Sequence, residues 1–390
     1  MKIDAVLAQT ILDTRGRPTI ETTLTAGELS ATASVPSGKS TGEHEAYELD
    51  AILAVTHVNG EIADTITTRD FNTPDELDTF LITLDGTPNK SRLGANAILS
   101  VSIAAQRLVA IQKGVPLWKS IAERAGTTPG APRLFVNMMN GGVHAGFKLP
   151  FQEYILVVDG ATSIALPIAQ EAFAKLGEGL GAVPMGDEGG YAPTFENLER
   201  PFEMLAELVK EFPGTSIALD AAASQLFKDN AYHLLGKAYS TNELVEMYAN
   251  IAGQFGIKSI EDPFDEHAAD DFVRLTAAMH GRILIVGDDF TCTNTELITT
   301  AIGKKAITAV LIKPNQIGTV MESIQAVQKT YAAGLQAIAS HRSGETSDTF
   351  IADFAYGIGA HGLKAGGFGQ KERVLKYERL LAIEREAKTM

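Results

Sequence analysis

Cysteine is nearly absent from this chain of 390 residues, in which Cys292 is the only example. A single thiol cannot form an internal disulfide, so a disulfide-stabilised fold is excluded and a reducing, cytoplasmic location is expected. The sequence also lacks a Cys/His pair at the spacing typical of zinc ligands, and it therefore gives no indication of a zinc site.

Long apolar runs are missing as well. The sequence has no uninterrupted stretch of about 20 apolar residues, the length that a helix needs to cross a bilayer. Residues 1–5 lack the apolar core and the cleavage site of a secretory signal. We therefore expect no membrane partner.

Positive charge is scarce. The chain has 33 Lys and Arg against 48 Asp and Glu, a net charge of −15. This balance argues against a nucleic-acid-binding surface. It also means that an anionic substrate would need a locally cationic pocket or bound metal ions.

The sequence pattern changes near residue 130. Residues 1–125 mix strand-like alternation, as in residues 20–25, with helical segments such as residues 96–113. Residues 126–132 are rich in Gly, Pro and Thr, which is typical of a linker. We expect an N-terminal α+β domain over residues 1–125 and a second domain, built of β/α units, over residues 133–390.

In the second domain, short apolar runs each end in a charged residue or a histidine and are followed by a helical stretch. Two weaker runs are expected to end near Glu153 and at Lys364. The terminal residues are 41, 27, 25, 28 and 23 positions apart at Asp220, Glu261, Asp288, Lys313, His341 and Lys364. A β/α barrel spends roughly 30 residues on each unit and carries its active site at the carboxyl ends of the strands. A doubly wound open sheet also binds ligands at strand ends, so the spacing alone leaves both architectures open.

The residue types at these ends indicate a particular chemistry. Asp220, Glu261 and Asp288 would repel one another unless a cation lay among them, and oxygen ligands favour magnesium. Lys313, on the next strand, could act as a base if neighbouring cations favour its neutral form. Glu188, in a glycine-rich turn, could protonate a leaving hydroxyl if its pKa is raised.

Two loops have sequences that bear on the binding of an anionic group such as a phosphate. Residues 341–346 offer a cation, a hydroxyl and backbone donors, which suit a phosphate. Residues 36–42 lack the spacing of a P-loop, so a nucleotide-hydrolysing site is rejected, and their small residues suit a mobile lid.

At these residues the sequence resembles the enolase family. The motifs occur in the family's order along nearly the whole chain: DTRG (13–16), LGANAILS (93–100), NGGVHAG (140–146), FQE (151–153), GDEGG (186–190), SIEDPF (259–264), GDD (287–289), KPNQIG (313–318) and SHRSGET (340–346). The resemblance implies an α/β fold, an enolase-type (β/α)8 barrel whose first units depart from simple βα order, with an N-terminal α+β capping domain. It also implies reversible dehydration of 2-phospho-D-glycerate to phosphoenolpyruvate, a step of glycolysis, with two Mg²⁺ per active site.

The resemblance further implies a role for each matching residue. Lys313 would take the C2 proton, Glu188 would help the C3 hydroxyl leave, and Glu153 would assist at that hydroxyl. The remaining contacts are His144 and Gln152 beside the substrate, Arg342 and Ser343 at the phosphate, Lys364 at the carboxylate, His341 as a neighbouring histidine, Asp220, Glu261 and Asp288 at the first magnesium, and Ser40 at the second. The resemblance also implies a homodimer or homo-octamer, the usual assemblies of the family. Arg15 resembles a residue of the dimer contact, although it could instead anchor the N-terminal hairpin.

Three departures from the family pattern keep alternatives open. Lys39 stands where the family has alanine, a basic segment is missing after residue 50, and residues 365–373 differ from the usual pattern. One alternative is a related hydratase or synthase that acts on another phospho- or phosphono-acid. The other is a non-catalytic binding protein with the same fold.

Overall fold

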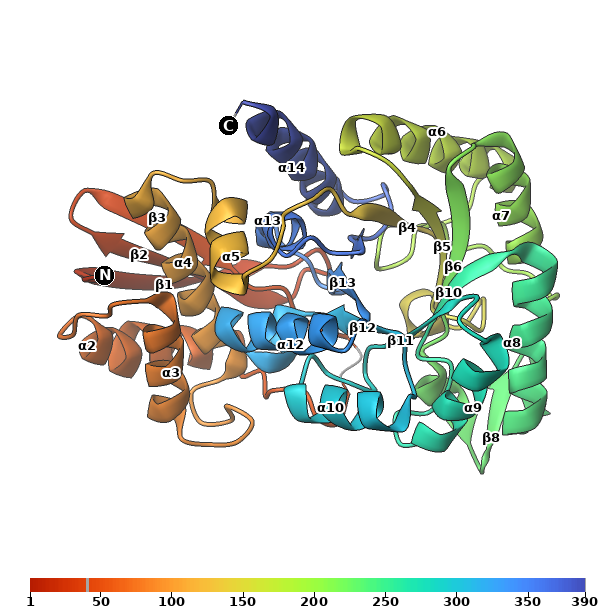
Figure 1. The fold of residues 1–390 in the computed structure, drawn as a ribbon, viewed down its shortest axis with the longest axis horizontal. Helices are drawn as coiled ribbons and strands as arrows, with labels where there is room; N and C mark the ends of the chain where they lie inside the picture. Colours follow the sequence, from red (N-terminus) through yellow and green to blue (C-terminus); the bar gives the residue numbers. More distant parts are fainter. Residues whose placement is uncertain (40–41, 390) are drawn as a thin grey trace.

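The computed structural model describes residues 1–39 and 42–389, which form an N-terminal sheet with helices beside a closed barrel (Figure 1). The N-terminal sheet is antiparallel in the order β1 (Ala5–Leu12), β2 (Pro18–Ala26) and β3 (Leu29–Ser34). Residues 20–25 lie in β2, as their alternation predicts. The helices that follow are α1 (Ala51–His57), the π-helical η1 (Val58–Ile62), α2 (Ala63–Ile66), α3 (Pro74–Asp85), α4 (Ala95–Lys113) and α5 (Leu117–Ala125).

Helix α4 is the core helix of this part of the chain. It packs on β2 and β3 and ends at Gly114, whose left-handed conformation closes the last turn. By length and composition it is also the one helix of the described chain that could cross a membrane, yet 78% of its apolar window is buried inside the protein. Its apolar character is therefore accounted for by the core that it forms.

Eight strands close the barrel, and the prediction of a barrel rather than an open sheet is confirmed. In spatial order the barrel strands are β10 (Ile257–Glu261), β11 (Leu284–Gly287), β12 (Ala309–Ile312), β13 (Gln336–Ser340), β14 (Gly362–Lys364), β4 (Arg133–Asn140), β5 (Glu153–Val158) and β6 (Thr215–Asp220). Their apolar side chains are buried on both faces, as expected for parallel strands that are covered by helices.

One strand runs against the others. β5 pairs antiparallel with both β4 and β6, whereas the other neighbours in the barrel are parallel. The expectation that an apolar run ends near Glu153 is therefore wrong, because the strand begins at that residue. Glu153 still reaches the same rim as the parallel strand ends, since it pairs with Asp220, the last residue of β6.

Helices surround the barrel (Figure 1). They are α6 (Thr162–Leu180), α7 (Arg200–Glu211), α8 (Thr241–Phe255), α9 (Ala269–Met279), α10 (Thr295–Lys304), α11 (Pro314–Ile317), α12 (Val320–Ala332), α13 (Phe350–Gly357) and α14 (Lys371–Lys388). Short elements complete the chain: the 3₁₀ turns η2 (Gly142–Ala145) and η3 (Ala223–Leu226), and a small sheet of β7 (Phe227–Lys228), β8 (Ala231–Leu234) and β9 (Lys237–Tyr239).

Candidate active site

Side chains from the carboxyl ends of the barrel strands meet at one rim. Six predicted site residues share one position, at the last residue of a parallel strand or one residue beyond it: Asp220, Glu261, Asp288, Lys313, His341 and Lys364. A cavity of about 20 Å³ is lined there by Lys39, His144, Gln152, Glu188, Lys313, Ser340, His341, Arg342, Ser343 and Lys364. The fold thus brings most of the predicted catalytic and substrate-contacting side chains to a single space.

Lys364 is the central cation of this rim. Its Nζ lies 2.6 Å from Glu153 Oε2, 2.8 Å from Asp220 Oδ2 and 2.8 Å from Glu261 Oε1. The lysine is buried, and these carboxylates raise its pKa well above the usual range although burial acts in the opposite direction. The glutamine predicted beside the substrate joins the same group, because Gln152 Nε2 donates to Asp220 Oδ2 over 3.1 Å.

Lys313 forms an ion pair with Asp288. The other oxygen of that carboxylate, Asp288 Oδ1, accepts a hydrogen bond of 2.9 Å from Gln316 Nε2. Burial and the charges of Arg342 and Lys364 lower the pKa of Lys313, but the Asp288 carboxylate outweighs them and the net pKa is raised. The cationic form of Lys313 is therefore the stable one in this arrangement, in contrast to the neutral form that the sequence argument favoured.

Glu188 and Glu153 form a pair of buried carboxyl groups with different proton affinities. Asn137 Nδ2 donates to Glu153 Oε1 over 2.7 Å, and Asn140 Nδ2 donates to Glu188 Oε2 over 3.2 Å. Burial, with the charge of Glu153, raises the pKa of Glu188 to about 7. Burial would also raise the pKa of Glu153, but Lys364 and a hydrogen bond from His341 hold it well below the usual range. Up to about pH 7, Glu188 therefore keeps a proton while Glu153 is ionised.

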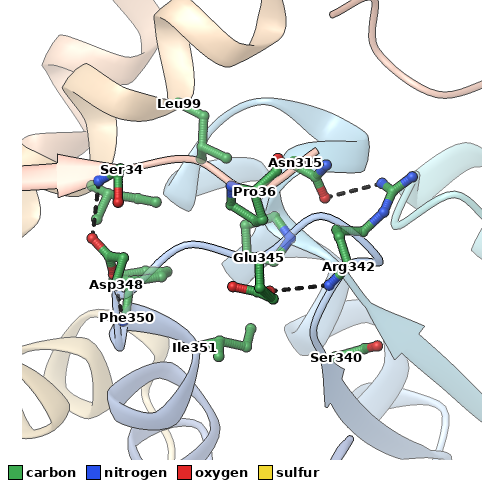
Figure 2. A pocket seen from close by; sticks show the side chains of 12 residues that line it. Ser34, Pro36, Leu99, Asn315, Ser340, Arg342, Glu345, Asp348, Phe350 and Ile351 are labelled. Carbon is green, nitrogen blue, oxygen red and sulfur yellow. Dashed lines mark hydrogen bonds between the residues drawn. The ribbon is translucent and has the colours of Figure 1, made fainter. Parts of the chain in front are cut away.

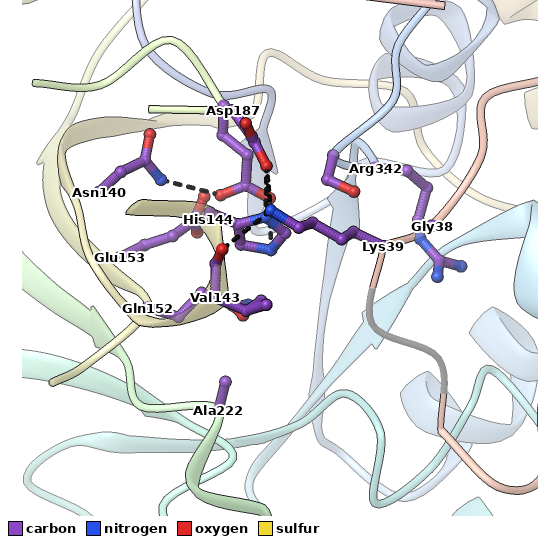
Figure 3. A network of polar contacts seen from close by, with 12 residues as sticks. Gly38, Lys39, Asn140, Val143, His144, Gln152, Glu153, Asp187, Ala222 and Arg342 are labelled. Atoms are coloured by element: carbon purple, nitrogen blue, oxygen red, sulfur yellow. Dashed lines mark hydrogen bonds and ion pairs between the residues drawn. The ribbon is translucent and has the colours of Figure 1, made fainter. Parts of the chain in front are cut away.

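Two histidines flank this pair. Burial and the Arg373 guanidinium lower the pKa of His341 to about 3, so its ring is neutral, with Nε2 3.5 Å from Glu153 Oε1. His144 lies beside Asp187 (Figure 3), with Nδ1 3.6 Å from Asp187 Oδ2. Its other ring nitrogen, Nε2, is 3.5 Å from Glu188 Oε1. Burial lowers the pKa of His144, but the two carboxylates reverse this effect and raise it.

The predicted phosphate residues lie where the N-terminal part meets the barrel. Arg342 Nη1 is 2.9 Å from Glu45 Oε2 and 3.0 Å from Asn315 Oδ1. A further cavity of about 30 Å³ lies beside Arg342, between the end of β3 and the segment that leads into α13 (Figure 2). Ser343 Oγ accepts a hydrogen bond of 3.2 Å from Arg15 Nη1.

Arg15 makes its contacts within the chain. Its side chain is 8% exposed, pairs with Asp13 over 3.0 Å and donates to Ser37 Oγ over 2.6 Å. It therefore ties the N-terminal hairpin to the predicted phosphate loop, which agrees with the anchoring interpretation. Its role at a dimer contact stays a prediction.

The donor set fits a hard divalent cation. Among the described residues, the three predicted ligand carboxylates and Glu153 form ion pairs with two lysines, Lys364 and Lys313, so four carboxylates share two ammonium groups. Burial and the charges of Asp220 and Asp288 raise the pKa of Glu261 well above its usual range, which reflects that excess of carboxylates. An oxygen-only set with uncompensated charge suits magnesium. Ser40, predicted at a second ion, lies outside the described residues.

The closest clusters of potential ligand atoms differ from the predicted trio. Among the described residues, two groups bring such atoms within 4.8 Å of one another: Glu153, Glu188 and His341; and Asp262, Asp288 and Asp289. Asp220, Glu261 and Asp288 are not one of them, because Lys364 and Lys313 draw their oxygens toward separate ammonium groups. The trio as a metal site stays a prediction.

Several residues of the site were not predicted. Glu45 holds Arg342, and Asp262 accepts hydrogen bonds from the backbone N–H groups of Asp288 and Asp289 over 2.8 and 2.7 Å. Arg373, fully buried, contacts His341 and donates to the carbonyls of Asp187 and Ser343 over 2.9 and 3.0 Å. Asp262 lies within the SIEDPF motif and could have been found there, whereas nothing local marks Glu45 or Arg373.

The altered segment after Lys364 supports the turn that carries Glu188. Gly367 N donates to Glu188 O, and Gly369 N donates to Gly189 O, both over 2.9 Å. A Cβ on Gly367 would lie 2.4 Å from Gly189 O, and Gly189 itself has φ +76°. The glycines of residues 366–369 are therefore explained by the close approach of two backbones.

Comparisons with known proteins point to one family along nearly the whole chain. The family profile described as "Enolase, N-terminal domain" matches residues 3–121, and "Enolase, C-terminal TIM barrel domain" matches residues 130–389. Enolase of Methanocaldococcus jannaschii is 40% identical over 99% of this chain and 95% of its own length. Enolase of Campylobacter jejuni subsp. jejuni is 39% identical over 99% of this chain and 97% of its own length. Enolase B of Dictyostelium discoideum is 39% identical over 99% of this chain and 95% of its own length.

These matches cover both parts of the fold and include every residue of the rim described above. The resemblance seen in the motifs is thereby confirmed, and the chain belongs to the enolase family.

Proposed function

We propose that this chain is a hydro-lyase that interconverts 2-phospho-D-glycerate and phosphoenolpyruvate in glycolysis. The observation that carries the proposal is that a lysine, Lys313, and a glutamic acid that holds its proton near neutral pH, Glu188, line the same cavity. Removal of a proton from C2 and loss of hydroxide from C3 need one base and one acid in one site.

The residues divide the reaction between them. Once substrate binding has separated it from Asp288 and it has lost its proton, neutral Lys313 accepts the C2 proton. The electron pair of the broken C–H bond moves into the substrate carboxylate, which gives the dianionic intermediate, and then forms the C2–C3 double bond as the C3 hydroxyl leaves. Glu188 donates its proton to the C3 hydroxyl, which leaves as water. Glu153, which stays ionised, keeps that proton on Glu188. Arg342 and Ser343 would hold the phosphate, and Lys364 would hold the carboxylate.

A magnesium ion held by Asp220, Glu261 and Asp288 would supply positive charge for the substrate carboxylate and its dianionic intermediate, as is general for enolase-superfamily sites. The cavity of about 20 Å³ is close to the space that one water molecule needs. Substrate binding therefore requires the ion pairs of Lys313 and Lys364 to rearrange.

Finer features are proposed on the family resemblance. They are two Mg²⁺ per site with Ser40 at the second, a homodimer or homo-octamer, and a cytoplasmic location without nucleic-acid or membrane partners. Residues 1–125 would act as the capping domain and residues 133–390 as the catalytic barrel. The acidic clusters and the net charge of −15 support the metal and the absence of nucleic acid.

The test is the rise in ultraviolet absorbance as phosphoenolpyruvate forms from 2-phosphoglycerate with magnesium. Turnover of at least about 1 s⁻¹ is expected for a metabolic enzyme. Folded, magnesium-binding protein without this activity would instead favour a related phospho- or phosphono-acid as substrate. Lys39 and the altered segment after Lys364 are the two features that favour that alternative. The ammonium of Lys39 pairs with Asp187, and the backbone of the segment binds the turn at Glu188 and Gly189.

A further inference from the structure

The Lys39 side chain joins the N-terminal part of the chain to the barrel. Its Nζ donates to Asp187 Oδ2 over 2.6 Å and to the Val143 carbonyl over 2.9 Å (Figure 3). Lys39 follows β3, whereas Val143 lies in η2 and Asp187 in the turn after α6. One ammonium group therefore links three segments that are more than 40 positions apart in the sequence.

The geometry favours this contact over a solvated lysine. The side chains of Lys39 and Asp187 are 28% and 33% exposed, so the ion pair is partly shielded from water. Two residues before Lys39, Ser37 exchanges backbone hydrogen bonds of 2.8 and 2.9 Å with Gly344. Because the backbone is already held there, placing the ammonium costs less conformational entropy than on a free loop.

Asp187 and His144 lie between the Lys39 ammonium and the proposed acid, Glu188. Asp187 precedes Glu188 and also faces His144, whose other ring nitrogen faces Glu188. The His144 and Lys39 contacts lower the pKa of Asp187 to about 2, so the carboxylate is ionised and is shared by both groups. Any movement of Lys39 away from Asp187 would leave the turn at residues 186–190 with one fixed contact fewer.

We propose that Lys39 is a positioning residue for Glu188. Its ammonium binds the Asp187 carboxylate and the Val143 carbonyl, a pair of contacts called the clamp below, and so fixes the positions of Glu188 and His144 relative to each other. The kinetic consequence rests on the proposed function, whereas the clamp itself does not. A lysine that contacted the substrate phosphate would act differently, since it would contribute to binding and leave the geometry of the acid unchanged.

The first experiment measures the clamp without turnover. Each lysine is acetylated at limiting reagent, and its rate is read by mass spectrometry with the exposed Lys148 as internal reference. Asp187→Asn should speed acetylation of Lys39 relative to Lys148 by about two- to fivefold, the range that a partly exposed ion pair supports. Asp270→Asn, which removes the partner of Lys304, is the matched control and should leave the ratio unchanged. An equal ratio in all three proteins would overturn the clamp.

The second experiment separates positioning from binding. Lys39→Met should lower kcat for phosphoenolpyruvate formation several-fold with little change in KM, because the acid is displaced while the phosphate contacts remain. Lys39→Arg, which can still pair with Asp187, should recover most of kcat, and Lys148→Met should behave as wild type. A raised KM at unchanged kcat would overturn the proposal in favour of a phosphate contact, as would an arginine variant no better than methionine.

The two experiments distinguish the possible failures. If wild-type protein makes no phosphoenolpyruvate, the proposed function fails, and the acetylation ratio still decides whether the clamp exists. If Lys39→Met does not fold, acetylation of Asp187→Asn still decides it, because that variant keeps the lysine.

Discussion

Replacement of Glu188 by glutamine tests the assignment of the acid most directly. Glutamine keeps the size of the side chain and an oxygen that accepts from Asn140, but it has no proton to donate. General acid catalysis contributes about 10²–10⁴-fold, so kcat for dehydration should fall by that factor. In the wild-type protein the acid is lost as pH rises through about 7, and dehydration should weaken in step.

The same substitution has a calculable effect on stability. Between the ordinary value of 4.5 and the folded value of about 7, native Glu188 keeps a proton that the unfolded chain has released. The free energy of unfolding therefore falls as pH rises through this window. At about 1.4 kcal/mol for each pH unit, the free energy of unfolding falls by about 3 kcal/mol across the whole window. The Glu188→Gln variant has no carboxyl group at this position and should not show this decrease.

The assay compares urea unfolding at about pH 5 and about pH 8 for the two proteins, with turnover measured in parallel. The wild type should lose about 2–3 kcal/mol more than the variant over this interval. Glu196→Gln, at an exposed position, is the control and should follow the wild type in both measurements. Identical pH slopes for wild type and Glu188→Gln, or near-normal turnover of the variant, would refute the assignment.

Three further predictions concern the cations and their ligands. Lys313→Ala should lower turnover by about 10²–10⁴-fold while magnesium binding, measured by calorimetry, stays largely intact; near-normal rates would contradict its role as base. Asp288→Asn should weaken magnesium binding and raise the magnesium concentration for half-maximal rate, and an unchanged requirement would count against Asp288 as a ligand. Lys364→Met leaves buried carboxylates without their cation and should destabilise the metal-free protein by about 3–5 kcal/mol, seen as a lower Tm. Added magnesium should restore part of that Tm, and a Tm that is insensitive to both changes would contradict the proposed charge balance.

The parallel strands could be located from the sequence because their apolar runs and spacing are local properties. Each run that ends in Asp220, Glu261 or Lys364 is a strand that ends at that residue. Hydrophobic patterning indicates which segments are buried but not the direction in which a strand runs. The antiparallel orientation of β5, which begins at Glu153, could therefore not be predicted from it. Closure of the sheet likewise depends on the pairing of β14 with β4, which no single segment records.

By itself, the sequence determined which chemical groups the protein carries and which strand ends bear them, since both follow from residue type and from periodicity along the chain. Only the tertiary structure decided how those groups share charge: Lys364 among three carboxylates, Glu45 on Arg342, and Lys39 on Asp187. These contacts join residues more than 100 positions apart. The physical reason is that pKa values and ion pairs depend on distances and burial, which exist only after the barrel has closed and the N-terminal part has packed against it.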